Sequence, residues 1–341
     1  MKKAVILFNL GGPDKLETVE PFLFNLFKDP EIISIPAILR YPLAKFISKR
    51  RAPIAKNIYK EIGNKSPILE LTQNQAKKLE NNLCEIGNYK CFVVMRCWHP
   101  RAEHVISEIK LYNPDEVILM PLYPQFSAST SGSSINEWKD ICNKNNYTKP
   151  TKTICCYPID VEFLNAHISL IKEEISNLEN FKLIFSAHGL PERNIKKGDP
   201  YQWQIESSVN EIVKNLNHPD LDWILSYQSR VGPLKWIGPS TDDEIINASK
   251  LNQTIVVVPI AFVSEHSETL VELDIEYKKL AMQNGCKNFK RIKALGEKKE
   301  FISSLANLVL KCNLLNDNQD FCYPKIKCPE NFKKCPCSAR L

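Results

Sequence analysis

Seven short, continuous apolar runs alternate along the chain with longer amphipathic stretches, and this alternation constrains the fold more than any other feature of the sequence. Stretches such as NQAKKLENNLCEI and HISLIKEEISNLENF separate the runs. Apolar runs without polar interruption are typical of parallel strands that helices cover on both faces. We therefore predict an α/β fold. The runs lie at residues 5–10, 91–97, 116–122, 152–157, 182–188, 222–227 and 254–262.

Two stretches of the second half repeat patterns of the first. VILFNLGGP at 5–13 is similar to LIFSAHGLP at 183–191, and VILMPLYPQFSAST at 117–130 is similar to VVVPIAFVSEHSET at 256–269. Each stretch reads as a strand that ends in a Gly/Pro-rich or hydroxyl-rich turn. The repetition predicts two similar, doubly wound, Rossmann-like domains.

The length of 341 residues, with 43% hydrophobic content, also suits two domains. We expect an N-terminal domain at 1–155, a C-terminal domain at 156–311 and a cysteine-rich tail at 312–341. In open parallel sheets, ligands bind beyond the carboxyl ends of the strands. A cleft between the domains, lined by the four turns above, is the expected ligand site.

Charge and hydropathy restrict the partners. The net charge is +6, and the basic cluster KFISKRRAPIAK at 45–56 suits a solvated face, or contact with anionic lipid or with substrate carboxylates. The longest apolar runs fall far short of the roughly 20 residues of a membrane span, and no export signal is evident. GxGxxG and GxxxxGK[ST] patterns are absent, so we expect a cytoplasmic protein without a nucleotide cofactor or nucleic-acid partner.

His188 ends the run LIFSAH, where the chain must turn into Gly-Leu-Pro. A strand places its last side chain rigidly, so the imidazole would point into the expected cleft. A hydrogen-bonded structural role is the alternative for a single histidine in this position.

Glu268, Glu272 and Glu276 recur at every fourth residue just after the strongest predicted strand. A locally widened π-turn would hold all three in line, and such distortions are frequent at functional sites. The alternative is a solvated acidic face. No lysine partner intervenes before Lys278, so these like charges would repel one another. The row, next to His266, suits transient passage of cations or protons better than a permanent zinc site.

The chain contains 12 cysteines, five of them after residue 311. Without an export signal they indicate thiols or metal ligands and not disulfides. Cys328, Cys335 and Cys337 give a C-x6-C-x-C spacing with Cys322 upstream, and the close C-x-C pair favours iron–sulfur ligation over zinc. A flexible tail with unligated thiols is the alternative.

The turns and strands together resemble the ferrochelatase family from about Ala4 to about Leu310. The motifs that carry the resemblance are NLGGP, MRCWHP, YPQFSASTSGSS, FSAHGLP, KGDPY, YQSRVGPLKWIGPSTDDEI and PIAFVSEHSETLVELDIEY. The resemblance implies a two-domain chelatase fold with a porphyrin cleft. It also implies insertion of Fe(II) into protoporphyrin IX, which yields protohaem and two protons.

The resemblance also assigns roles to residues. His188 and Glu268 match the essential histidine and glutamate, and Glu272 and Glu276 fall on the family's acidic row, which would carry protons or iron. The segment 22–46 resembles the apolar lip beside the porphyrin entrance, which suggests loose attachment to the inner face of a membrane. Residues that match cleft-lining, substrate-binding positions are Leu10, Arg96, Tyr123 and Trp236.

Some ferrochelatases carry a 2Fe–2S cluster on three C-terminal cysteines and one from the body of the chain, and four thiolates are required. The tail spacing resembles that of the bacterial cluster-bearing members. For the fourth ligand we favour Cys156 over Cys155, since both end the strand KTICCY; Ala166 occupies the position that animal enzymes use.

Three other functions compete with protoporphyrin ferrochelatase: a coproporphyrin ferrochelatase, a tetrapyrrole-binding protein without catalysis, and an iron–sulfur sensor. The combination of His188 with Glu268 and its acidic row argues against the second. The sequence is compatible with either a monomer or a homodimer.

Overall fold

The computed structural model describes residues 1–230, 232, 234–314, 320–322 and 328–336. The chain forms two compact units. Unit 1 comprises Met1–Cys156 with Leu305–Cys322, and unit 2 comprises Tyr157–Ser304 with Tyr323–Leu341.

Unit 1 is built on a parallel sheet in the order β2-β1-β3-β4-β9. Its central strands are almost completely buried, and each buried Ile, Leu or Val side chain stabilises the fold by ~2 kcal/mol. The strands are β1 (Lys2–Asn9), β2 (Asn88–Met95), β3 (Glu116–Pro121), β4 (Thr151–Cys156) and β9 (Asp320–Cys322).

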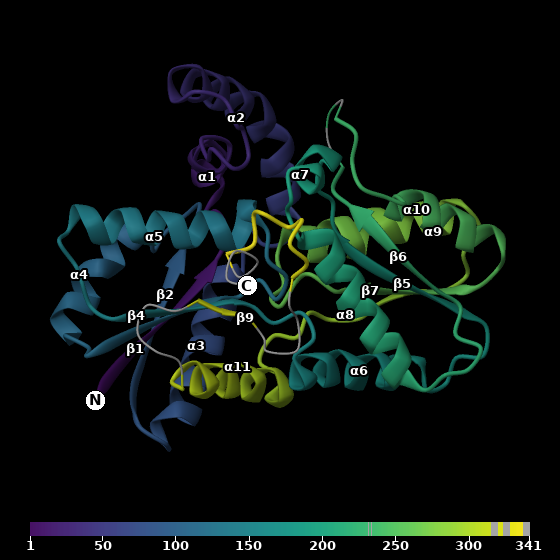
Figure 1. The fold of residues 1–341 in the computed structure, drawn as a ribbon. Coiled ribbons are helices and arrows are strands. Elements are labelled where there is room, and N and C mark those ends of the chain that lie inside the picture. Colours follow the sequence, from purple (N-terminus) through teal and green to yellow (C-terminus); the bar gives the residue numbers. More distant parts are fainter. Residues whose placement is uncertain (231, 233, 315–319, 323–327, 337–341) are drawn as a thin grey trace. The chain divides into compact units, whose positions relative to one another are not determined.

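Helices cover the sheet of unit 1. α4 and α5 lie along one face (Figure 1). On that face Ile106, Ile109 and Trp138 pack against Ile6 and Val94. α1 and α2 form a helical pair that packs through residues such as Phe22 and Tyr59. The elements are η1 (Leu16–Thr18), α1 (Val19–Phe27), α2 (Ala37–Lys60), α3 (Ile68–Cys84), α4 (Ala102–Tyr112), the π-helix η2 (Ala128–Gly132) and α5 (Ser133–Lys144).

Unit 2 contains a second parallel sheet, in the order β6-β5-β7-β8. α9, α10 and the π-helix η3 pack on one face through Ile245, Leu273 and Ala281. The strands are β5 (Phe181–His188), β6 (Trp223–Gln228), β7 (Thr254–Pro259) and β8 (Phe289–Arg291). The helices are α6 (Val161–Ile175), α7 (Glu192–Lys196), α8 (Tyr201–Leu216), α9 (Thr241–Lys250), η3 (Glu268–Tyr277), α10 (Lys278–Gln283) and α11 (Lys299–Cys312), whose last turns belong to unit 1.

The two sheets have the same strand order. Counted from the first strand of each unit, the order is 2-1-3-4 in both, and β9 extends the first sheet by one strand. This is the doubly wound arrangement in which the order reverses between the first and third strands. The predicted α/β class, the seven predicted strands and the similarity of the two halves are confirmed.

In the part of the chain that the structure describes, no helix is both long enough and apolar enough to cross a membrane.

Candidate active site

His188 is the last residue of β5, at the carboxyl edge of the sheet of unit 2. β5 lies between β6 and β7, and the strand order of this sheet reverses between β5 and β7. The segment that follows β7 leads directly into the π-helix η3. Ligands of doubly wound sheets bind at this point of reversal, so the fold places His188 and Glu268 where binding is expected.

Gly189 fixes the direction in which the chain leaves β5. Its N–H donates to the carbonyl of Gln228 at 2.9 Å. A Cβ atom at position 189 would lie 2.9 Å from that carbonyl oxygen and 3.3 Å from the ring of Trp236. Only glycine fits this close approach of backbone to backbone, and the turn therefore holds the His188 backbone in register with β6.

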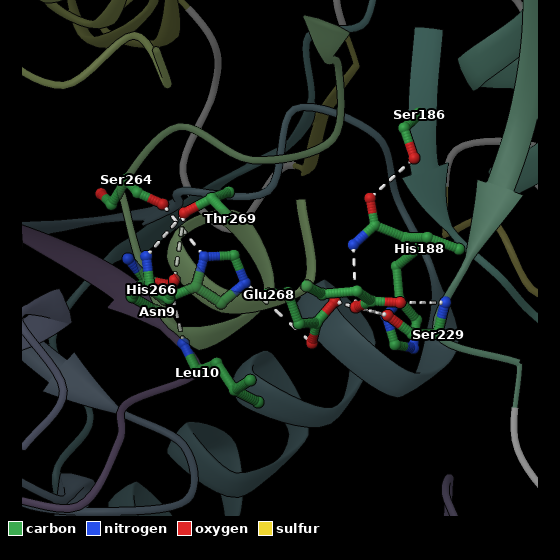
Figure 2. A network of polar contacts seen from close by, with 11 residues as sticks. Asn9, Leu10, Ser186, His188, Ser229, Ser264, His266, Glu268 and Thr269 are labelled. Atoms are coloured by element: carbon green, nitrogen blue, oxygen red, sulfur yellow. Dashed lines mark hydrogen bonds and ion pairs between the residues drawn. The ribbon is translucent and has the colours of Figure 1, made fainter. Parts of the chain in front are cut away.

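The side chains of His188 and Glu268 are hydrogen-bonded. Nδ1 of His188 lies 2.8 Å from Oε2 of Glu268, as Figure 2 shows. The two side chains remain 42% and 25% exposed, so the pair is accessible to a ligand. Glu268 is the first residue of the π-helix η3, so the widened helix that was one interpretation of the glutamate spacing is present. The other carboxylate oxygen of Glu268, Oε1, lies 4.0 Å from Nε2 of His266.

Ser229 joins the first two glutamates of the row. Its hydroxyl lies 3.1 Å from Oε2 of Glu268 and donates at 2.6 Å to Oε2 of Glu272, while its backbone N–H donates to Oε1 of Glu272 at 2.8 Å. Ser229 adopts a left-handed conformation with φ of 60°, which is unusual for a residue with a side chain. Gln228 Nε2 and Tyr277 Oη complete the contacts of Glu272 at 3.1 and 3.2 Å.

The charges of the site shift its pKa values in opposite directions. Burial opposes ionisation of all three groups. In His188 the charge and hydrogen bond of Glu268 outweigh burial and raise the pKa. In Glu268 the His188 imidazolium outweighs burial and lowers the pKa to about 2. Burial, reinforced by the negative charge of Glu268, raises the pKa of Glu272. Within the pair, the proton is therefore favoured on His188 and the negative charge on Glu268, and the neighbouring Glu272 takes up a proton more readily than an isolated carboxylate does.

Glu276 and His266 lie differently from the pair. Glu276 is exposed on η3, so the structure brings Glu268 and Glu272 together through Ser229 but does not add Glu276 to that network. His266 is 7% exposed, and its Nδ1 lies 3.2 Å from the carbonyl oxygen of Ser264. Burial lowers the pKa of His266, so this second imidazole is the more readily neutral of the two.

The expected substrate-binding residues are divided between the units. Leu10 and Tyr123 are half-buried and follow β1 and β3 of unit 1. Arg96 follows β2, is 9% exposed and is paired with Asp29 and Glu137. Trp236 lies in unit 2 and forms an isolated bridge with Pro191, beside the turn that follows His188.

The cysteines of the expected cluster also come from both units. Cys156 ends β4 of unit 1, and it and Cys155 are buried. Cys328 and Cys335 of unit 2 are 2% and 1% exposed, whereas Cys337 lies outside the described residues. Among the described residues, no group of three or more His, Cys, Asp or Glu side chains is arranged to hold a metal.

The sequence did not single out Ser229 or Gln228 as functional residues. Gln228 is the last residue of β6 and pairs with His188 in the register of β5 and β6, and Ser229 follows it within the motif YQSRV. The signal available in the sequence was their position at the carboxyl end of a predicted strand, where ligands were expected to bind. The left-handed backbone of Ser229, which creates the two contacts to Glu272, has no signature in the sequence because Gly or Asn usually occupies such positions.

Comparison with solved structures identifies the fold. SirB from Bacillus subtilis with Fe3+ aligns with a TM-score of 0.56 and 14% identity, over 92% of this chain and 96% of SirB. DR2241 from Deinococcus radiodurans, described as similar to chelatases, aligns with a TM-score of 0.51 and 10% identity, over 92% and 55%. The fold is that of the chelatases.

Sequence comparison defines the family. The ferrochelatase family profile matches residues 2–312. A ferrochelatase from Pelagibacter ubique is 66% identical over 99% of both chains, and one from Rickettsia prowazekii is 49% identical over 98% of both. The chain belongs to the ferrochelatase family.

Proposed function

We propose that this protein is a ferrochelatase that inserts Fe(II) into protoporphyrin IX, with release of two protons, to give protohaem as the last step of haem biosynthesis. The observation that carries the proposal is the His188–Glu268 pair at the carboxyl edge of the sheet of unit 2. Membership of the ferrochelatase family supports the same reaction.

The reaction requires a base. Each porphyrin has two pyrrole N–H protons that must leave as iron bonds to the nitrogens. An imidazole near the ring centre can accept a proton only in its neutral form. Glu268 raises the proton affinity of His188, so each proton taken from a pyrrole is held on the His188–Glu268 pair until it passes to solvent. Walls that favour a bent macrocycle would expose the nitrogen lone pairs and lower the barrier.

Iron, the second substrate, needs oxygen or nitrogen donors on its way to the ring. Glu268, Glu272 and Glu276 supply carboxylates along one helix, and His188 supplies a nitrogen at its end. We propose that iron passes along this row and that Leu10, Arg96, Tyr123 and Trp236 belong to the porphyrin site.

The direct test is an anaerobic insertion assay on the purified full-length chain with Fe(II) and either protoporphyrin IX or coproporphyrin III. Formation of protohaem, with a higher kcat/KM for protoporphyrin IX than for coproporphyrin III, supports the proposal. A preference for coproporphyrin would make the protein a coproporphyrin ferrochelatase. Tight porphyrin binding without insertion would make it a tetrapyrrole-binding protein or, with a cluster and a partner, a sensor.

We also propose that Cys328, Cys335, Cys337 and Cys156 ligate a 2Fe–2S cluster. The buried thiols of Cys328 and Cys335, next to the Gln204 amide that lies 3.4 Å from Cys328 Sγ, suit such a group. Thiolates in a dry setting with hydrogen-bond donors are typical cluster ligands. The absorption spectrum of anaerobically purified protein tests the assignment: Cys337→Ser should bleach the visible bands, and retention of colour would refute it.

Finally, we propose a cytoplasmic location with loose contact to the inner face of a membrane. The first half of α2 exposes Ile38, Leu39 and Phe46, which are 82%, 61% and 62% accessible, and basic residues follow at 49–51. Exposed apolar side chains flanked by lysine and arginine bind anionic bilayers weakly. Sedimentation with vesicles of anionic or neutral lipid tests this; equal recovery in the supernatant of both would oppose it.

A further inference from the structure

A group of buried charges surrounds Arg96 in unit 1. The guanidinium Nε donates to Oγ of Ser133 at 2.6 Å. Nη2 lies 2.8 Å from Oδ2 of Asp29, and Nη1 lies 3.2 Å from Oε1 of Glu137, which also pairs with Arg101. Every nitrogen of the Arg96 side chain therefore has a partner within the same unit.

Asp29 connects this group to the turn between α1 and α2. Oδ2 of Asp29 contacts Arg96 and accepts a hydrogen bond from the Ser133 hydroxyl. Oδ1 accepts from the N–H of Glu31 at 2.9 Å. The carbonyl of Asp29 accepts from the N–H groups of Ile32 and Ile33 at 3.1 and 2.9 Å. Asp29 is 2% exposed, so it organises the turn 29–33 from within.

The turn 29–33 lies within the apolar segment 22–46 and connects its two helices. α1 ends two residues before Asp29, and α2 begins at Ala37. Arg40, in the first turns of α2, donates from Nε to the carbonyl of Lys28 at 2.9 Å and from Nη1 to that of Ile35. Movement of Asp29 would therefore move both helices, and with them the exposed side chains of Ile38 and Leu39.

The buried carboxylates beside Arg96 limit what its guanidinium can bind. A porphyrin propionate that displaced Asp29 from Arg96 would leave a 2%-exposed carboxylate without its cation. Removing one partner of a buried ion pair is strongly unfavourable because the other charge stays desolvated. A propionate that joined the group without displacement would face the charges of Asp29 and Glu137.

We infer that Arg96 is a positioning residue of the insertion reaction: through Asp29 it fastens the segment 22–46 to the start of helix α5, and it does not hold a porphyrin propionate. This inference rests on the proposed function and specifies how Arg96 serves it.

The test compares Asp29→Asn, Arg96→Leu and the double variant in the full-length protein. If Arg96 is a positioning residue, each single substitution should lower kcat/KM for porphyrin by about tenfold. The kcat/KM of the double variant should be at most about threefold below that of the less active single variant, because all three variants break the same Arg96–Asp29 connection. Hydrogen exchange of the backbone at 28–40 should rise in all three. Asp140→Asn, an exposed change on the same helix α5, is the matched control.

Direct propionate binding predicts the opposite for Asp29. In Asp29→Asn, Arg96 would lose its carboxylate partner and could bind propionate more readily, so porphyrin affinity would be unchanged or tighter. Arg96→Leu alone would weaken porphyrin affinity. That pattern, or normal kcat/KM in both variants, overturns the inference. If circular dichroism shows that either variant does not fold, Ser133→Ala, which removes the hydroxyl between Arg96 and Asp29, repeats the comparison. Absence of insertion by the wild-type protein would refute the proposed function, whereas unchanged exchange at 28–40 would refute this inference alone.

Discussion

Ser229 donates both its backbone N–H and its hydroxyl to Glu272, at 2.8 and 2.6 Å. The two donors hold Glu272 beside Glu268 although the charges of the two carboxylates repel. Because Ser229 also lies within 3.1 Å of Glu268, one residue sets the spacing between the histidine–glutamate pair and the next carboxylate of the helix.

His188→Ala should abolish insertion and leave porphyrin binding largely intact, because the imidazole acts on the pyrrole protons. We expect kcat to fall by roughly 10²–10⁴-fold, the usual contribution of a general base. An anaerobic Fe(II) or Zn(II) insertion assay and a porphyrin fluorescence titration measure the two effects. Near-normal turnover would remove His188 from the catalytic role.

Glu268→Gln should also lose activity while the fold is retained by circular dichroism. The amide cannot stabilise an imidazolium, so the pKa of His188 should fall towards or below its ordinary value. The imidazole resonances followed by NMR between pH 5 and pH 9 report this shift. An active Glu268→Gln variant with an unchanged His188 titration would reduce the glutamate to a solvated surface residue.

Glu272 and Glu276 should differ, although both lie on the acidic row. Glu272→Gln disrupts a residue that accepts from Ser229, Gln228 and Tyr277, and we expect kcat to fall by about tenfold. Glu276 is exposed, so Glu276→Gln should raise KM for Fe(II) with little change in kcat. Equal effects of the two substitutions on kcat would contradict this ordering.

Gly198 should be irreplaceable because the C-terminal segment docks on it. Its φ is +87°, and a Cβ there would lie 2.8 Å from the N atom of Lys333 and 2.9 Å from the O atom of Asn331. Gly198→Ala should therefore release the segment 328–336 to limited proteolysis. Gly285→Ala is the control, since Gly285 has a φ of +93° but no atom within 4 Å of its Cβ position. Equal protection of the segment in both variants would refute the docking role.

His167 predicts how stability depends on pH. Both ring nitrogens lie buried without a hydrogen-bond partner among the described residues, and burial lowers the pKa of this histidine to about 3. The unfolded chain protonates near pH 6.5 and the folded one does not, so this contribution to stability is complete above pH 6.5 and declines as the pH falls. Between pH 7.5 and 5.0 the loss is ~2 kcal/mol.

Urea unfolding of the wild type and of His167→Leu at the two pH values measures this contribution. The variant should lose ~2 kcal/mol less than the wild type over the same interval. An identical loss in both proteins would show that His167 does not set the acid sensitivity.

The sequence predicted the strands better than the site. Seven strands were evident because each is a continuous apolar run, whereas β8 contains Lys290 and Arg291 in three residues and offers no such run. The spacing of the glutamates suited either a π-helix or a solvated acidic face, of which the π-helix is present. It could not distinguish Glu272 from Glu276, because that difference depends on Ser229, which lies 43 residues from Glu272 in the chain. The contacts of Arg96 with Asp29 and Ser133 are equally long-range, and no local pattern encodes them.

The last stretch of the chain serves both units. β9, at Asp320–Cys322, pairs with β4 of unit 1, and the N–H of Lys334 bonds to the carbonyl of Gly198 in unit 2. Neither unit is therefore one continuous stretch of the chain, because unit 1 takes in residues 305–322 and unit 2 takes in residues 323–341. A protein truncated before Leu305 would lack both the strand that extends the sheet of unit 1 and the segment that docks on Gly198 of unit 2. A single cut at that point would thus remove part of the fold of each unit.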